Sequence, residues 1–120
     1  MQTVAKQAWK VDRVDPTPLH EQVAAEIRRA IADGEAAPGT RIPLARDLAA
    51  VLGANTNTVL RALRILRDEG LRELRRGRDT IVAGTPEKSA VLIQAKELIR
   101  FARQRGYQRE ELIALMHGIH

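Results

Sequence analysis

The chain has 120 residues, no cysteine and a net charge of +5, and these properties exclude several classes of protein. The lack of cysteine excludes disulfides, thiol chemistry and zinc–cysteine sites, and it suits a reducing compartment. No apolar run is long enough to span a bilayer, and the N-terminus lacks a signal-peptide pattern. We therefore expect a soluble cytoplasmic protein with no membrane partner.

Catalysis and metal binding also find little support. The sequence has no glycine-rich phosphate loop, nucleophile elbow or paired-carboxylate site. His117 and His120 are three residues apart and could share a helix face as a metal pair, but no third ligand is evident and a frayed terminus is the simpler interpretation. We predict that the protein is not an enzyme and has neither a cofactor nor a metal site.

The N-terminal residues 1–17 place Trp9-Lys10-Val11 in an alternating pattern before Asp15-Pro16-Thr17-Pro18. Because the residue before a proline favours extended backbone, we expect a short extended segment that packs on the following domain. Trp9 could stack on nucleic acid, but a single tryptophan is more often a packing residue.

The first helix is predicted from apolar residues at every fourth position, which are Leu19, Val23, Ile27 and Ile31. Gly34 stands where a C-terminal cap belongs. This helix presents one apolar stripe, which we expect to be buried against the two helices that follow.

Residues 42–71 predict two helices joined by a tight turn. In the second helix, Val59, Leu63 and Leu66 fall within about 60° of one another on a helical wheel and form an apolar stripe. The opposite face carries Asn57, Leu60, Arg61 and Arg64. A short helix with amide and guanidinium groups on its outer face fits a DNA major groove, although for an isolated helix a solvated face is the more common explanation.

Positive charge is concentrated in the same part of the chain. Residues 41–78 contain nine arginines, no lysine and four acidic residues, an excess of +5 that leaves the rest of the chain neutral. Such a local excess is typical of proteins that bind polyanions, and arginine suits bidentate contacts to phosphate and guanine. The whole chain has 16 arginines and 4 lysines, so the preference for arginine is also compatible with codon bias.

A β-hairpin is predicted directly after the second helix of this pair. Residues 71–75 and 80–83 form two short strands around the basic tip Arg76-Gly77-Arg78-Asp79, where Gly77 supplies the positive φ that such a turn usually needs. Taken by itself, this pattern indicates only a surface hairpin that carries arginines. After two helices it predicts a winged helix-turn-helix, whose tip reaches a neighbouring minor groove or its phosphates.

A second apolar pattern follows Gly84-Thr85-Pro86, and it predicts a long helix ending near Gly106 and then a short one. Two such helices cannot close a core alone, so a second copy of the chain is the simplest partner. A symmetric dimer also matches an inverted-repeat site. The alternative is that the helices fold back on the first domain. The predicted dimer-interface residues are Val91, Leu92, Ala95, Leu98, Ile99, Ala102, Leu112, Ile113, Leu115 and Met116.

Landmark residues run in unbroken register through about half of the chain: Pro18-Leu19, Gln22, Arg28-Arg29, Gly34, Pro38-Gly39, Ile42-Pro43, Arg46, Leu48-Ala49, Gly53, Asn57-Thr58-Val59, Ala62-Leu63, Glu69-Gly70-Leu71, Gly77 and Val82. On these residues the chain resembles the GntR family of bacterial transcription regulators. Its short tail and turn sequence resemble the small YtrA-like branch, which implies a dimeric repressor. The tail is too short for a ligand pocket within one protomer. A small-molecule effector could still bind at the dimer interface, but nothing in the sequence identifies one.

The resemblance also implies roles for single residues. Arg46 matches a family arginine that contacts DNA from outside the recognition helix, and Gly77 matches the wing tip. The turn and the first turn of the recognition helix match positions that contact base edges and phosphates. The predicted DNA-binding residues are Arg46, Asn55, Thr56, Asn57, Leu60, Arg61, Arg64, Arg75, Arg76, Gly77 and Arg78.

Four residues depart from the family pattern. Leu44 stands where a serine usually caps the second helix, which costs about 1 kcal/mol. Thr56 stands where the branch often has proline. Leu60 replaces a common arginine, so it is suited to a thymine methyl group and not to a phosphate. Asp79 replaces a second wing glycine and puts a negative charge near DNA.

We therefore predict a mainly α fold with a small β-hairpin. A winged helix-turn-helix domain covers residues 1–84, and a helical dimerisation tail covers residues 85–120. The predicted function is a sequence-specific transcription regulator, a repressor, that binds double-stranded inverted-repeat operator DNA as a homodimer. Its recognition helix spans residues 55–69 and its basic wing residues 75–79. The alternative is a protein-interaction module that reuses the winged-helix scaffold and has only non-specific DNA affinity.

Overall fold

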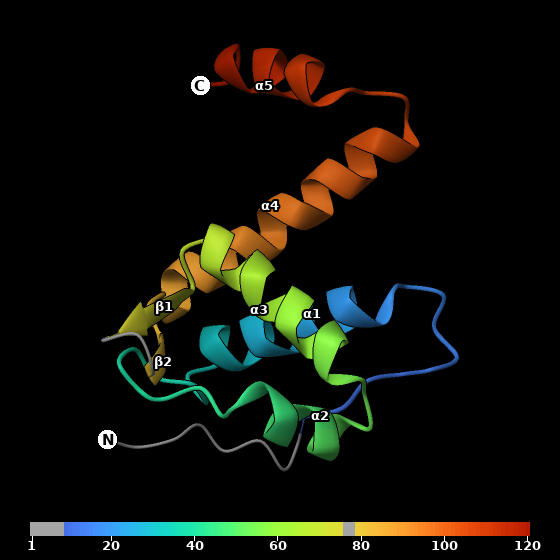
Figure 1. The fold of residues 1–120 in the computed structure, drawn as a ribbon. Coiled ribbons are helices and arrows are strands. Elements are labelled where there is room, and N and C mark those ends of the chain that lie inside the picture. The colour runs from blue at the N-terminus through green and yellow to red at the C-terminus, as the bar shows by residue number, and fades with distance from the viewer. Residues whose placement is uncertain (1–8, 76–78) are drawn as a thin grey trace. The chain divides into compact units, whose positions relative to one another are not determined.

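The computed structural model describes residues 9–75 and 79–120 (Figure 1). The elements in chain order are α1 (Leu19–Ala32), α2 (Ala45–Leu52), α3 (Thr56–Asp68), β1 (Arg72–Arg75), β2 (Asp79–Val82), α4 (Pro86–Gln104) and α5 (Arg109–His117). This mainly helical fold with one two-stranded antiparallel sheet confirms the predicted fold class. The chain divides into two compact units, one ending at Ala90 and the other covering Val91–His120, so the division lies inside α4.

The core of the first unit lies between α1, α2 and α3, and α3 packs against both other helices (Figure 1). The apolar stripe predicted for α3 is buried, and so is that of α1 apart from Leu19, which is half-buried at the start of the helix. The buried large side chains of the three helices are Val23, Ile27, Ile31, Leu48, Leu52, Val59, Leu63 and Leu66. Trp9 is only 3% exposed, which confirms that it is a packing residue. Each such apolar side chain contributes roughly 1.5–3 kcal/mol when it is fully buried, so this core holds α3 firmly in place.

The helix ends follow from local sequence. After α1, Gly34 adopts a φ of 82°, as expected for the left-handed residue that ends a helix. Gly53 ends α2 in the same way, with a φ of 65°. Leu44 occupies the N-cap position of α2 and makes no side-chain hydrogen bond there, so the predicted absence of a cap is confirmed.

The hairpin has the predicted place in the chain. β1 and β2 pair in antiparallel register, with Arg72 opposite Val82 and Arg75 opposite Asp79. Residues 76–78, which hold the predicted wing-tip residues Arg76, Gly77 and Arg78, lie outside the described part of the chain.

A third segment, residues 40–42, pairs with β2 and was not predicted from the sequence. The Ile42 N–H donates to the Thr80 carbonyl at 2.7 Å, and the Val82 N–H donates to the Thr40 carbonyl at 2.9 Å. Arg41 and Ile81 form the bridge between them. The hairpin is therefore tied to the segment that leads into α2, so its position relative to the helices is fixed.

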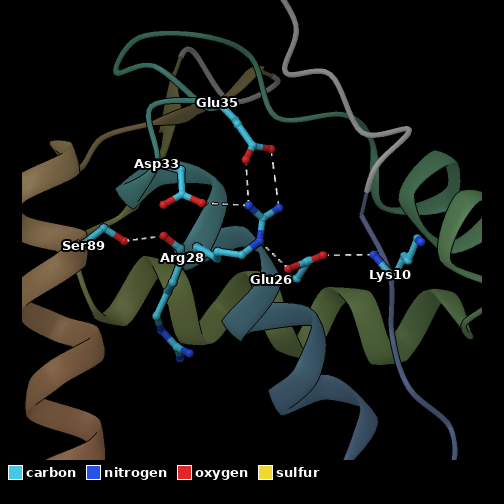
Figure 2. A network of polar contacts seen from close by, with 7 residues as sticks. Lys10, Glu26, Arg28, Asp33, Glu35 and Ser89 are labelled. Atoms are coloured by element: carbon cyan, nitrogen blue, oxygen red, sulfur yellow. Dashed lines mark hydrogen bonds and ion pairs between the residues drawn. The ribbon is translucent and has the colours of Figure 1, made fainter.

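A polar cluster joins three elements of the first unit. Arg28 of α1 forms two hydrogen bonds with Glu69, the residue that follows α3. The Ser89 Oγ donates to the Arg28 carbonyl at 2.7 Å, and Figure 2 shows these two residues facing each other. Ser89 is completely buried. The first turn of α4 is therefore anchored on α1, which explains why the first compact unit extends past residue 84.

The second unit contains the rest of α4, a turn and α5. Gly106, with a φ of 85°, lies in the turn, and the Tyr107 N–H donates to the Ala102 carbonyl at 2.9 Å. A capping box between Gln108 and Glu111 begins α5. None of the helices in the described part of the chain is long and apolar enough to cross a membrane.

Candidate DNA-binding surface

The outer face of α3 carries the side chains that the helical wheel places there. Asn57, Leu60, Arg61 and Arg64 are all exposed. The opposite face of the helix is buried against α1 and α2. Among the described residues, Arg61 and Arg64 form no ion pair. Their guanidinium groups therefore keep their donors available for an external acceptor.

The start of α3 is organised by Asn55. Its side-chain Oδ1 accepts a hydrogen bond from the Asn57 N–H at 2.8 Å, which is the expected geometry of an N-cap. This bond occupies one acceptor of Asn55 and one backbone donor of the first turn. The Thr56 and Asn57 side chains remain exposed beside it.

Arg46 lies in the first turn of α2 and is exposed. The opposite side of α2 is buried through Leu48, Ala49 and Leu52. Like the two arginines on α3, Arg46 has no ion-pair partner in the part of the chain that the structure describes. Because α2 packs on α3, one rigid helical pair carries all three of these cations.

The hairpin contributes fewer free cations than its composition suggests. Arg75 is exposed at the end of β1. Arg72, in contrast, turns inward, and its Nη1 donates to the Leu63 carbonyl at 3.2 Å. Burial, followed by the nearby positive charge of Arg67, lowers the pKa of Arg72 below its ordinary value. Arg72 therefore braces β1 against α3 and is not a candidate DNA contact.

Arg29 of α1 is also committed to contacts within the protein. It donates to Glu26 at 2.7 Å, to Asp33 at 2.9 Å and to Glu35 at 2.6 Å, and Figure 2 shows the three carboxylates gathered around one guanidinium. The hydrogen bond to Glu35 is the largest cause of the raised pKa of Arg29, and the same bond lowers the pKa of Glu35. Three acidic neighbours make this part of the surface unsuited to phosphate.

Within the described residues, no group of three or more His, Cys, Asp or Glu side chains is placed to hold a metal ion. The outer face of α3 offers the exposed Asn57, Arg61 and Arg64 together with the exposed Leu60, and Arg46 of α2 adds a further cation. Such a set matches a DNA duplex, which presents phosphates along its edges and donors, acceptors and thymine methyl groups in its major groove.

Comparison with known proteins agrees with this geometry. The family model described as bacterial regulatory proteins, gntR family, matches residues 19–82. The chain belongs to the GntR family. It is 33% identical to the HTH-type transcriptional repressor YtrA of Bacillus subtilis over 110 residues, which cover 86% of this chain and 85% of that protein.

Solved structures of GntR-type proteins share the fold. YtrA from Sulfolobus acidocaldarius, a GntR-family transcription factor, is 33% identical and matches with a TM-score of 0.59 over 75% of this chain and 96% of that chain. The AraR DNA-binding domain in complex with operator ORX1 is 28% identical, with a TM-score of 0.56 over 62% of this chain and 94% of that chain. This GntR-family chain is thus a DNA-binding transcription regulator with a winged helix-turn-helix.

Proposed function

We propose that this protein is a homodimeric transcriptional repressor that binds an inverted-repeat operator and occludes a promoter. The observation that carries the proposal is the outer face of α3, where Arg61 and Arg64 are exposed and form no ion pair with described residues. The similarity to a repressor and to an operator-bound DNA-binding domain supports it. Because its target is chromosomal DNA, we place the protein in the cytoplasm, at the nucleoid when it is bound.

In this proposal α3 lies in the major groove. The Asn57 amide is suited to the edge of an adenine, and Leu60 is suited to a thymine methyl group. Arg61 and Arg64 reach guanine edges or phosphates further along the groove. Thr56 and the remaining amide donors of Asn55 face the strand that passes the start of the helix.

Contacts outside the recognition helix fix the register of the protein on the duplex. Arg46 contacts a phosphate from the first turn of α2. Arg75 approaches the next minor groove from the end of β1. These contacts carry little sequence information, so they raise affinity for all duplexes alike.

Dimerisation is assigned to the second unit. Ile113, Leu115 and Met116 of α5 are each about half exposed, at 48%, 51% and 52%, and Val91 and Leu98 of α4 are exposed at 68% and 43%. Covering so many large apolar side chains is favourable, and a second copy of the chain supplies a matching surface. Ala102 and Leu112 are already buried in the single chain, at 7% each, so we restrict the proposed interface to the other predicted residues.

The test is a pair of substitutions on the two helices. Arg61→Ala and Arg46→Ala are expected to weaken operator binding by about tenfold or more each, since each removes a charge-assisted contact worth roughly 1.5–3 kcal/mol. Arg103→Ala removes an exposed arginine of the second unit and is the charge-matched control. Unchanged affinity in both helix variants would refute the contact assignment.

A further inference from the structure

The segment before α1 is fastened to the first unit although it has no regular secondary structure. Trp9 is buried, and the Lys10 N–H donates to Glu26 at 3.0 Å. Gln22 of α1 holds the segment at two points. Its Oε1 accepts from the Asp12 N–H at 2.8 Å, and its Nε2 donates to the carbonyls of Asp12 and Thr17 at 2.9 Å each. The backbone on both sides of residue 13 is therefore held in place.

The side chain of Arg13 extends from this segment to the helix-turn-helix turn. Its Nη2 lies 3.6 Å from the position that a Cβ atom would occupy at Gly53, the residue that ends α2. Figure 1 agrees, since the blue segment before α1 passes beside the turn between α2 and α3. Only two residues separate Gly53 from the first residue of α3. A residue 43 positions before α3 thus brings a guanidinium next to the start of that helix.

Arg13 has the properties of a ligand-binding cation and not of a structural one. It is exposed, and it forms no ion pair or hydrogen bond with the described residues, unlike Arg28 and Arg29 of α1. Gly53 has no side chain, so the guanidinium can lie flat over the turn. The N-terminus of α3 beside it adds a partial positive charge from its unpaired N–H groups.

We propose that Arg13 is a further DNA-contacting residue, which binds a backbone phosphate of the operator strand that passes the turn between α2 and α3. This inference rests on the proposed function. Because the main chain of the segment is already anchored, binding restricts only the side chain of Arg13, so little entropy is lost for the contact. A phosphate contact does not read bases, so Arg13 contributes affinity and register and not sequence preference.

The experiment compares Arg13→Ala with Lys10→Ala on duplex DNA selected by the wild-type protein. Lys10 is the matched control because its side chain is exposed in the same segment and its hydrogen bond to Glu26 uses the backbone N–H. We expect Arg13→Ala to weaken binding about fivefold and to reduce the slope of log affinity against log salt by about 0.9, the value for one phosphate contact. Lys10→Ala is expected to change affinity less than twofold and to leave the slope unchanged.

Two further measurements make the result decisive. The loss in Arg13→Ala is expected to be equal on the selected site and on a site with one altered base pair, whereas a base-reading residue loses more on the selected site. The melting temperature of the free protein is expected to stay unchanged, which excludes an effect of unfolding. An unaltered affinity and salt slope in Arg13→Ala, with Arg61→Ala still impaired, would overturn this inference and leave the proposed function standing. A wild-type protein that selects no duplex would overturn both.

Discussion

Arg28 and Glu69 face each other through two hydrogen bonds, from Nε to Oε1 at 2.7 Å and from Nη2 to Oε2 at 3.0 Å. Their side chains are only 8% and 14% exposed. The pair joins the C-terminal half of α1 to the residue that follows α3, so it fixes the C-terminal end of α3, opposite the end that Asn55 caps. This one ion pair therefore contributes both to the stability of the fold and to the position of α3.

Breaking this pair on one side is expected to be costly. Arg28→Met removes the buried cation that donates two hydrogen bonds to the Glu69 carboxylate and should lower the free energy of unfolding by about 3 kcal/mol. The double variant Arg28→Met with Glu69→Leu removes both charges and should recover most of that loss. Urea denaturation of the wild type, both single variants and the double variant measures the coupling. Additive losses would show that the two residues do not depend on each other.

A serine at position 44 is expected to stabilise the protein. Leu44 is 55% exposed at the N-cap of α2 and offers no acceptor to the first turn, so Leu44→Ser adds the missing hydrogen bond at little loss of burial. The gain should be about 1 kcal/mol, seen as a rise of about 4 °C in melting temperature. Leu44→Ala, which removes the same side chain without adding an acceptor, is the control. Equal melting temperatures for the two variants would contradict the capping argument.

Substitutions of Asn55 separate its structural role from its proposed contact with DNA. Asn55→Ala removes the cap of α3 and should destabilise the fold by about 1 kcal/mol, whereas Asn55→Ser keeps an acceptor and should leave stability nearly unchanged. Thermal melts measure this difference, and operator titrations measure affinity. If Asn55 also contacts DNA through its amide, the serine variant binds more weakly although it is as stable as the wild type. Full affinity in the serine variant would remove Asn55 from the contact set.

The proposed dimer is tested on α5. Replacing both Ile113 and Met116 by glutamate puts charge on the exposed apolar face and is expected to yield a monomer in sedimentation velocity. Operator affinity should then fall by a hundredfold or more, on the order expected when two linked half-site contacts become independent. Gln104→Glu adds a charge at an exposed residue of the same unit without removing an apolar side chain and serves as the control. A double variant that sediments as the wild type does would exclude this face as the interface.

Much of the fold could be predicted because its signals are local. The apolar stripe of α3 is formed by residues three and four positions apart, and it is buried as the helical wheel requires. The hairpin register follows from two strands that are neighbours in the sequence. The missing cap at Leu44 follows from the chemistry of a single side chain, which has no hydrogen-bond acceptor.

The features that the sequence did not reveal depend on contacts between distant residues. The pairing of Thr40 and Ile42 with β2 spans about forty residues, and no periodic pattern in the sequence predicts it. Arg72 belongs to the arginine-rich segment, yet its side chain donates a hydrogen bond to the carbonyl of Leu63 within the protein. Arg13 is the opposite case. It lies outside the arginine-rich segment, and its side chain reaches the turn because Gln22 anchors the backbone around it. Charge counts along the chain do not distinguish free cations from those with partners.

Selection of binding sites from a random-sequence duplex library, at near-physiological salt and with the full chain, tests sequence-specific operator binding most directly. We expect enrichment of one motif with two-fold symmetry, bound by two protomers and protected in a footprint across both half-sites. The Arg61→Ala variant should enrich the same library poorly. A library that stays random while the protein still retains DNA would contradict sequence-specific recognition and leave only non-specific affinity for the duplex.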